Sequence, residues 1–178
     1  ITPSGKLTTT FPRSVGQLPL FYNHLNTGRP DPDSRMFNRY ASNYLDESNE
    51  PLYPFGYGLS YTDFVYGELQ ISSETLPKNG ELTVSVTVTN KGNYDGYETV
   101  QLYLRDIYAE VARPMKELKG FERIFLKSGE SRDVKFVITK DDLKFYNSEL
   151  HYVYEPGEFD VMVGPNSRDV QTKSFQAE

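Results

Sequence analysis

The stretch Glu81-Leu82-Thr83-Val84-Ser85-Val86-Thr87-Val88-Thr89-Asn90 decides the fold class of this chain, because apolar and hydroxyl side chains alternate along it. Successive side chains of a β-strand point to opposite faces of a sheet, so a period of two is typical of a strand with one buried face. The stretch therefore predicts a half-buried strand whose inward residues are Leu82, Val84, Val86 and Val88.

The same pattern continues along the chain. Residues 98–105 repeat it, with Val100, Leu102 and Leu104 expected inward and Tyr103 expected as a solitary outward ring. Further strands are expected at residues 64–71, 116–126, 132–138, 157–163 and 170–175, and a helical turn or two at 139–146. About seven strands over roughly 110 residues predict an all-β fold, an immunoglobulin-like or fibronectin type III-like sandwich.

Residues 1–52 differ from this part in composition and pattern. They are rich in Pro, Asn, Asp and Ser and show neither helical nor strand periodicity over a useful length. A structureless stretch of this length is rare inside a compact domain. We therefore expect an irregular segment that lies, through its aromatic rings, over the sandwich or over a neighbouring molecule, while residues 64–178 fold autonomously.

Between these two parts lies Tyr53-Pro54-Phe55-Gly56-Tyr57-Gly58-Leu59-Ser60-Tyr61-Thr62, a run dense in aromatic residues and glycines. Pro54 fixes its own φ and favours an extended Tyr53, while Gly56 and Gly58 permit φ values that other residues resist. Aromatic rings at such a junction provide large area to bury. We predict a structural linker over residues 53–63, carried by Pro54, Phe55, Gly56, Tyr57, Gly58, Leu59, Ser60 and Tyr61.

Further motifs give the chain a family resemblance. They are Pro3-Ser4-Gly5-Lys6-Leu7, Phe11-Pro12-Arg13-Ser14-Val15-Gly16-Gln17-Leu18-Pro19, Asn26-Thr27-Gly28-Arg29-Pro30, Arg113-Pro114-Met115-Lys116-Glu117-Leu118-Lys119-Gly120-Phe121 and Tyr154-Glu155-Pro156-Gly157-Glu158-Phe159. With the linker, they closely resemble the C-terminal end of family-3 glycoside hydrolases of the β-glucosidase type. The resemblance implies that residues 1–52 are the incomplete C-terminal tail of an upstream α/β domain, that 53–63 are the linker, and that 64–178 are a fibronectin type III-like domain.

The resemblance also implies where the chemistry lies. In this family the nucleophilic Asp belongs to an N-terminal barrel and the general acid/base Glu to the following α/β domain, both upstream of the matched residues. The chain is therefore expected to hold no catalytic residue and to be inactive alone, bracing the catalytic domains of a parent that hydrolyses terminal β-D-glucosidic bonds with retention. The implied partners are those upstream domains and the parent's β-glucoside substrate, a homodimer is allowed, and the implied location is periplasmic or secreted.

Composition argues against several other classes. The chain has 178 residues, a formal charge of −6 and a pI near 5.0, and its basic residues are scattered among carboxylates, which argues against nucleic acid as a partner. The absence of cysteine excludes disulfides and thiolate metal sites. No apolar run approaches the roughly 20 residues that span a bilayer, so no membrane partner is predicted. Ile1 is neither an initiator nor the start of a signal peptide, and we interpret the chain as a cut fragment.

Carboxylates are abundant, and a glycosidase needs two carboxyl groups about 5–10 Å apart. Polar, loop-like sequence without the apolar flanks that raise a pKa predicts plain solvation for Asp31, Asp33, Asp46, Glu47, Glu50 and the pair Asp141-Asp142. Asp31-Pro32-Asp33-Ser34 could supply oxygen ligands to calcium, but a Pro-Asp turn explains it as well. His24 and His151 lack Cys or nearby His companions. We predict no metal site and no cofactor.

The candidates for contact with substrate are Arg29 and Tyr40, which we place at the rim of the parent's substrate site. Packing of the tyrosine and pairing of the arginine with a carboxylate are the competing interpretations. The alternative function is that of a carbohydrate-binding or adhesion module. Such a module would require an exposed, coplanar strip of aromatic rings on one sheet face. The outward Thr, Ser and Lys side chains of the predicted strands support such a strip poorly.

Overall fold

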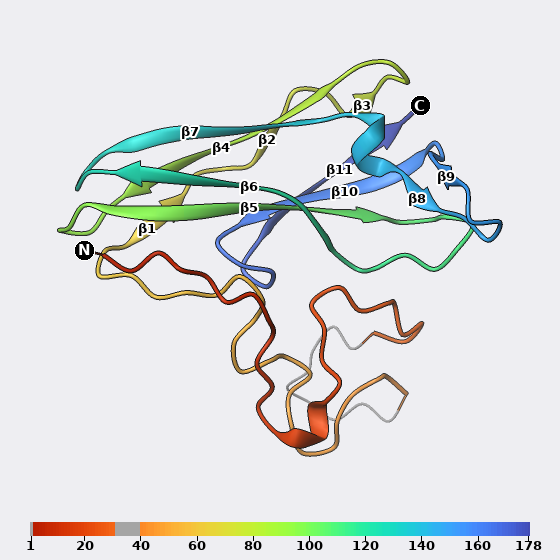
Figure 1. The fold of residues 1–178 in the computed structure, drawn as a ribbon, viewed down its shortest axis with the longest axis horizontal. Helices are drawn as coiled ribbons and strands as arrows, with labels where there is room; N and C mark the ends of the chain where they lie inside the picture. Colours follow the sequence, from red (N-terminus) through yellow and green to blue (C-terminus); the bar gives the residue numbers. More distant parts are fainter. Residues whose placement is uncertain (1, 31–39) are drawn as a thin grey trace.

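The computed structural model describes residues 2–30 and 40–178, and its regular structure is almost entirely β (Figure 1). This described part contains eleven strands and two short 3-10 helices, η1 (Val15–Gln17) and η2 (Lys140–Leu143), and no α-helix. Every strand lies between Phe64 and Ala177. The all-β prediction is therefore confirmed, as is the irregular character of the described residues that precede the sandwich.

Two sheets pack face to face, as Figure 1 shows. The smaller sheet has a central strand, β4 (Leu82–Asn90), paired with β1 (Phe64–Tyr66), β2 (Gln70–Ile71) and β7 (Ser131–Ile138). The larger sheet has the order β3 (Thr75–Leu76), β11 (Gln171–Ala177), β10 (Gly157–Gly164), β5 (Gly96–Asp106) and β6 (Glu117–Leu126). A separate hairpin, β8 (Phe145–Tyr146) with β9 (Tyr152–Val153), lies at the end of the sandwich near the C-terminus.

The core lies between the sheets and consists of the side chains that alternate inward. Val84 and Val88 of β4 are completely buried, as are Val100 of β5 and Val161 of β10, and all four belong to one apolar cluster. Complete burial of such a side chain contributes about 1.5–3 kcal/mol. The predicted inward faces of residues 82–88 and 100–104 are thus confirmed.

The segment expected as one strand at residues 64–71 is two strands, β1 and β2. Between them the N–H of Gly67 still donates to the carbonyl of Thr87 in β4 at 2.8 Å, but the other bonds go to a side chain of β11. Gln171 Oε1 accepts from the N–H of Leu69 at 3.0 Å, and Gln171 Nε2 donates to the carbonyl of Gly67 at 2.6 Å. This arrangement turns Leu69 into the core, where it is 1 % exposed. The single-strand prediction was wrong because the interrupting contact comes from a residue far away in the sequence.

The expected helix at residues 139–146 is shorter than predicted. Thr139 caps η2, since its hydroxyl accepts from the N–H of Asp141, and the carboxylate of Asp142 accepts from the Thr139 N–H at 2.8 Å. The helix ends at Leu143, and the strand β8 follows. The two aspartates lie in the first turn, where the positive end of the helix favours negative charge.

A register shift interrupts the pairing of β5 with β6 near Gly120. Leu102 pairs with Gly120, but the next residue, Tyr103, pairs with Leu118, so Lys119 is an extra residue in β6. An extra residue of this kind is a β-bulge and bends the strand that carries it. The bulge lies beside Tyr103, where the N-terminal part of the chain covers the sheet.

Candidate functional site at the junction of the N-terminal segment and the sandwich

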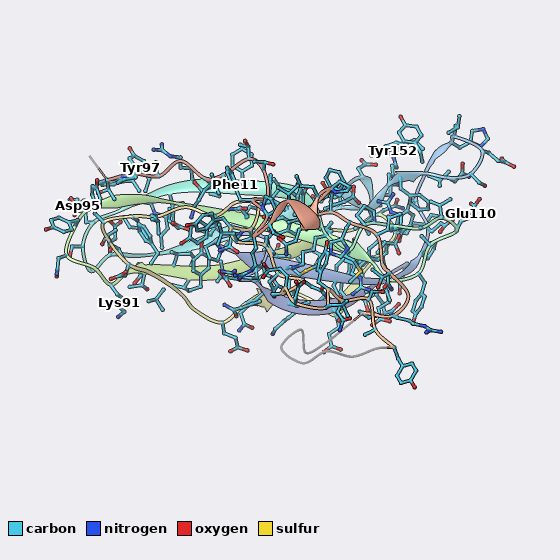
Figure 2. The ribbon with its side chains drawn as sticks, turned by 90° about the horizontal axis from the view of Figure 1, so that it is seen from below. Phe11, Lys91, Asp95, Tyr97, Glu110 and Tyr152 are labelled. Carbon is cyan, nitrogen blue, oxygen red and sulfur yellow. The ribbon has the colours of Figure 1, made fainter. Side chains whose placement is uncertain are left out.

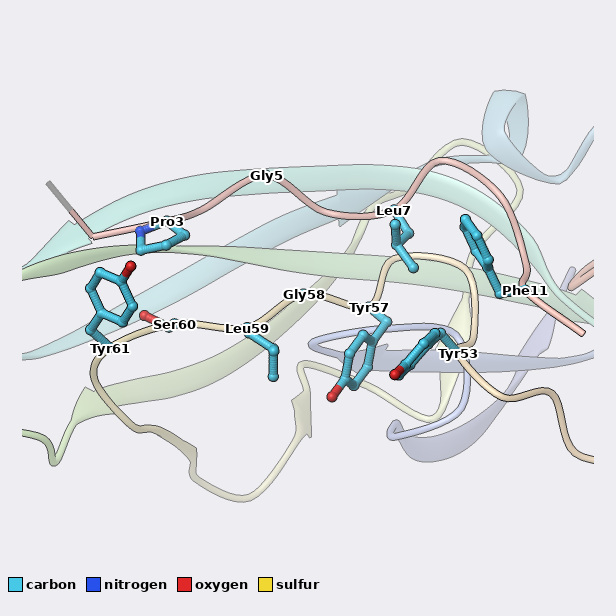
Figure 3. A pocket seen from close by; sticks show the side chains of 10 residues that line it. All are labelled: Pro3, Gly5, Leu7, Phe11, Tyr53, Tyr57, Gly58, Leu59, Ser60 and Tyr61. Carbon is cyan, nitrogen blue, oxygen red and sulfur yellow. The ribbon is translucent and has the colours of Figure 1, made fainter. Parts of the chain in front are cut away.

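The linker, residues 53–63, pairs with the beginning of the chain. The N–H of Leu7 donates to the carbonyl of Tyr57 at 2.8 Å, and the N–H of Gly56 donates back to the carbonyl of Leu7 at 2.8 Å. Phe11 and Tyr53 form an isolated antiparallel bridge. The residues before the linker, 2–30 and 40–52, are called the N-terminal segment below. Its first residues and the linker therefore run side by side along the sandwich (Figures 1 and 3).

Gly56 brings the linker into contact with the larger sheet. Its φ is +77°, and a Cβ there would lie 1.9 Å from Oε1 of Gln101. Gln101, on the outer face of β5, is 3 % exposed, and its Nε2 donates to the carbonyls of Gly56 at 3.1 Å and Pro165 at 2.6 Å. Its Oε1 accepts from the hydroxyl of Tyr103. A buried amide with all these partners fixes the linker in place, because losing any one would leave a buried polar group unpaired.

An aromatic stack joins the N-terminal segment to the same sheet face. Tyr22 stacks on Phe55 with ring centroids 4.2 Å apart and meets Tyr103 edge-on at 5.9 Å. Tyr103 is completely buried, and burial, with the nearby Tyr22, raises the pKa of its hydroxyl well above the ordinary value. Tyr103 points away from the core, as expected, but it is not an exposed ring, because the N-terminal segment and the linker cover it.

Lys116 adds a polar connection beside this stack. Its Nζ donates to the carbonyl of Ser167 at 2.6 Å, and the N–H of Ser167 donates to the carbonyl of Phe55 at 2.9 Å. Burial lowers the pKa of Lys116, while Glu50 and Asp169 act in the opposite direction. The loop that follows β10, the loop that precedes β6 and the linker are thus bonded to one another.

An ion pair anchors the first residues of the chain. Lys6 Nζ lies 3.0 Å from Oε1 of Glu98, and the hydroxyl of Tyr66 donates to the same oxygen at 2.9 Å. Both charged side chains are largely buried. Burial, followed by the charge of Glu98, raises the pKa of Tyr66 strongly, so this hydroxyl stays protonated and continues to donate.

The outward side of the junction is an apolar groove with a volume of about 600 Å³ (Figure 3). Its lining comes from both paired segments: Pro3, Gly5, Leu7, Phe11, Tyr53, Tyr57, Gly58, Leu59, Ser60 and Tyr61. The rings of Tyr53 and Tyr57 stack at 5.1 Å, yet Leu59 is 73 % and Tyr61 70 % exposed. The linker therefore buries one side against the sandwich and presents an apolar side outward. Exposed apolar patches of this kind mark interaction surfaces.

The predicted rim residues lie outside this groove. Arg29 is exposed, and its carbonyl accepts from the N–H of Ser42 at 2.8 Å, while Tyr40 is 70 % exposed. A role at a substrate rim stays a prediction for both. Asp31 and Asp33, with the possible calcium loop Asp31-Pro32-Asp33-Ser34, lie outside the described residues.

The described carboxylates named from the sequence have local partners or face solvent. Asp46 and Glu50 are exposed, Glu47 lies 4.0 Å from Arg13 Nε, and Asp142 caps η2. Lys144 lowers the pKa of exposed Asp141 through a hydrogen bond. In the part of the chain that the structure describes, no group of three His, Cys, Asp or Glu is placed to hold a metal ion, and no helix is long and apolar enough to cross a membrane.

One carboxyl group that the sequence analysis missed has an unusual environment. Burial raises the pKa of Asp106 from 3.8 to about 6, against the opposing effect of Arg113. Its Oδ1 has no hydrogen-bond partner. A signal was present in the sequence, because Asp106 continues the inward alternation of Val100, Leu102 and Leu104 at the end of β5.

The strip of aromatic rings expected of a carbohydrate-binding face can be compared with the outer face of β5 and β6. Phe121 is 65 % and Phe125 37 % exposed there. The rings of Tyr97 and Phe125 are inclined by 58°, and the guanidinium of Arg123 lies 3.7 Å from the centroid of Tyr97. These rings do not form a coplanar strip, and Arg123 occupies one face of Tyr97.

The comparisons with known proteins agree with this fold. Residues 98–167 match the fibronectin type III-like domain family. The chain is 51 % identical over 174 residues to a periplasmic β-glucosidase from Salmonella typhimurium, and 45 % identical over 176 residues to a putative β-xylosidase from Formosa agariphila. These matches cover 98 % and 99 % of this chain but only 23 % and 22 % of the relatives.

A solved structure gives the same result. The crystal structure of a β-glucosidase from Listeria innocua in complex with glucose matches with a TM-score of 0.89 and 46 % sequence identity, over 99 % of this chain and 24 % of that chain. The sandwich is thus a fibronectin type III-like domain. Nearly the whole chain is similar to the C-terminal fibronectin type III-like region of β-glucosidases and β-xylosidases of glycoside hydrolase family 3.

Proposed function

We propose that this chain is the non-catalytic C-terminal part of a retaining β-glucosidase that hydrolyses terminal β-D-glucosidic bonds, and that it braces the catalytic domains. The observation that carries the proposal is the match of nearly the whole chain to about a quarter of the length of family-3 enzymes. In this proposal residues 1–52 are the end of an upstream α/β domain, residues 53–63 are a linker, and residues 64–178 are the bracing domain.

The junction supports the bracing role. Three contacts hold the linker and the N-terminal segment on the sandwich: the bond from Gln101 to Gly56, the ring stack of Tyr22 on Phe55, and the ion pair between Lys6 and Glu98. A segment fixed in this way would transmit the position of the sandwich to the domain that continues from it. The apolar groove lined by Leu59 and Tyr61 would then be a surface on which the upstream domains pack.

The absence of catalytic activity in the chain itself is the second part of the proposal. The carboxylates named as candidates that the structure describes are exposed, cap a helix or lie near an arginine. Asp106 differs from them, because burial raises its pKa to about 6. Asp106 lies at the end of β5, with the guanidinium of Arg113 as its main opposing charge. The two carboxyl groups that raise its pKa further, Glu117 and Glu155, have partners of their own: Glu117 accepts from Arg113, and Glu155 accepts from the N–H of Glu110.

Hydrolysis of a chromogenic β-glucoside tests this proposal. The 178-residue chain is measured beside the full-length enzyme and beside an enzyme that lacks residues 64–178. We expect turnover by the full-length enzyme, none by the chain, and lower thermal stability and turnover in the truncated enzyme. Activity of the purified chain would contradict the non-catalytic role, and an unchanged truncated enzyme would contradict the bracing role.

Export of the full-length protein is a further part of the proposal. It is supported by the name of one relative, a periplasmic β-glucosidase, which is 51 % identical to this chain. Cell fractionation of the source organism, with the activity assayed in each fraction, tests the location. Activity confined to the cytoplasmic fraction would contradict it.

A further inference from the structure

A second cavity, with a volume of about 280 Å³, lies apart from the junction groove. Residues 105–115, which are the end of β5 and the loop that leads to β6, form most of its wall, and Asn26 of the N-terminal segment contributes the rest. Figure 2 places Glu110, in this loop, at the same end of the molecule as Tyr152 of the β8–β9 hairpin, and far from Tyr97. No function assigned above uses this cavity.

Two residues that line the cavity carry buried polar atoms without a hydrogen-bond partner. They are Oδ1 of Asp106, an acceptor, and Nε of Arg113, a donor. Nearly all buried polar atoms of proteins are hydrogen-bonded, so two open groups beside one cavity require an explanation. Burial raises the pKa of Asp106 to about 6, which is typical of a carboxylate with too few donors.

Other contacts of Arg113 explain why the two groups do not satisfy each other. Its Nη2 donates to Oε2 of Glu117, and its guanidinium lies 4.6 Å from the ring centroid of Phe145. No ion pair joins Arg113 to Asp106 among the described residues. The buried acceptor and the buried donor therefore both lack a partner among the described residues.

The lining of the cavity limits the class of that group. Asp106 and Glu110 are acidic while Arg105 and Arg113 are basic, so neither a cation nor an anion would be matched by the wall as a whole. A hydroxyl group can donate to a carboxylate and another can accept from a guanidinium, so a neutral molecule with several hydroxyls satisfies both. Tyr108 also lines the cavity and is 78 % exposed, which offers a ring face to the C–H groups of a sugar.

We propose that this cavity binds a small neutral saccharide, with Asp106 and Arg113 bonding to its hydroxyl groups and Tyr108 packing against its ring. A cavity of this size is at the small end of ligand sites, which suits one sugar ring. The site adds ligand binding to a domain whose proposed role is bracing. Only the choice of sugar probes rests on that proposed function.

Heteronuclear NMR of the 178-residue chain tests the site directly. The chain is titrated separately with methyl β-D-glucopyranoside, methyl β-D-xylopyranoside and inorganic phosphate. We expect saturable shifts of backbone amides in residues 105–115 with at least one sugar, at millimolar affinity, and none with phosphate. Absence of saturable shifts with both sugars, or shifts produced equally by phosphate, would overturn the proposal.

Three variants separate specific binding from general surface effects. Tyr108→Ala and Asp106→Asn should each weaken binding about fivefold or more, because each removes one of the interactions that define the site. Tyr94→Ala is the matched control, since Tyr94 is also exposed, at 62 %, and its neighbour Asp95 lies at the opposite end of the molecule in Figure 2. Equal affinity of the Tyr108→Ala and Tyr94→Ala chains would overturn the site.

The result is independent of the bracing role. Binding is measured on the chain without turnover, so its failure leaves the truncation experiment unaffected. Loss of activity or stability in the truncated enzyme, in turn, does not predict whether the amide signals of residues 105–115 shift on addition of a sugar. A thermal unfolding curve for each variant confirms that it is folded before titration.

Discussion

The sandwich buries large apolar side chains in its core, whereas the N-terminal segment leaves several of its own exposed to solvent. Phe159 and Phe175 of the sandwich stack at 5.7 Å and are each 2 % exposed, whereas Phe21 and Val15 of the N-terminal segment are 58 % and 84 % exposed. Two packed sheets close a core between them, but a segment that lies on one sheet face buries only the side chains directed at that face. The sandwich therefore encloses a core of its own, whereas the N-terminal segment leaves one apolar side exposed.

The outer face of the larger sheet shows the same division. Tyr103 is completely buried under Tyr22 and Phe55, while Phe121 of the neighbouring strand is 65 % exposed. Both side chains belong to the outer face, so strand periodicity does not distinguish them. Burial on this face depends on where the N-terminal segment lies, and this segment has no periodicity of its own.

The largest effect expected from this difference is on stability. Phe175→Ala should lower the free energy of unfolding by about 3–5 kcal/mol, because it leaves a cavity beside Phe159 in the core. Phe21→Ala should change it by less than about 1 kcal/mol, because most of that ring faces solvent. Equilibrium unfolding in urea, followed by far-UV circular dichroism, measures both.

The variants Phe175→Ala and Phe21→Ala also test the proposal that the N-terminal segment packs on upstream domains. In the full-length enzyme Phe21→Ala should become destabilising if its ring is covered there, whereas Phe175→Ala should cost the same in both contexts. Equal losses for the two variants in the chain would show that the N-terminal segment contributes to the core as much as the sandwich does.

The second largest effect on stability is expected at two glycines, and comparing them separates the cost of a close contact from the cost of backbone strain. Gly56 and Gly129 have nearly the same positive φ, +77° and +78°, but a Cβ at Gly56 would meet Gln101 whereas nothing lies within 4 Å at Gly129. Gly129→Ala should cost about 1 kcal/mol from the left-handed backbone alone. Gly56→Ala should cost about 2–4 kcal/mol, because it also displaces a buried amide from its hydrogen bonds.

Thermal unfolding of the two glycine variants gives these values, and the NMR signals of the Gln101 side-chain amide report the contact itself. Altered amide signals in Gly56→Ala, with unaltered signals in Gly129→Ala, are the expected pattern. Equal losses with unaltered amide signals would mean that Gln101 does not anchor the linker.

Much of the fold was predictable from the sequence because long strands carry a long pattern. β4, β5 and β10 each place three or more apolar residues at a spacing of two, and the inward faces of β4 and β5 were predicted correctly. The strands β3, β8 and β9 have two residues each, which is too short for any period to appear. The interruption between β1 and β2 depends on Gln171, a residue about a hundred positions later, and no local pattern reports it.

The junction was predictable in part. The density of rings and glycines in residues 53–62 indicated a linker that needs a surface, and Gly56 does contact the sheet. The position of Tyr22 over Tyr103 was not predictable, because the irregular segment that carries it gives no register. Asp106 could have been found, since it follows three inward apolar residues at a spacing of two.

A smaller effect should follow from pH. Burial raises the pKa of Asp106 from 3.8 to about 6, with Arg113 opposing and Glu155 and Glu117 adding to the rise. Between these pH values the folded chain holds a proton that the unfolded chain releases. The contribution of this carboxyl to stability is therefore complete below pH 3.8, falls as the pH rises, and is lost above about pH 6.

The variant Asp106→Asn removes this titration. Its stability should fall less than that of the unmodified chain as the pH rises through this range, by about 1 kcal/mol after allowance for the partial exposure of the carboxyl. Urea unfolding at a series of pH values measures the difference. Parallel pH profiles of the two chains would mean that Asp106 titrates normally.

The smallest effect on the chain is expected at the predicted rim residues. Arg29 is exposed and Tyr40 is 70 % exposed, so Arg29→Ala and Tyr40→Ala should each change the stability of the chain by less than about 0.5 kcal/mol. If they lie at the substrate rim of the full-length enzyme, each should raise KM or lower kcat/KM for a β-glucoside without lowering Tm. Leu45→Ala is the matched control, because Leu45 belongs to the same segment and is 79 % exposed. Equal kinetics for all three variants and the unmodified enzyme would exclude Arg29 and Tyr40 from the rim, whereas a loss of Tm with the loss of activity would assign them to packing between domains.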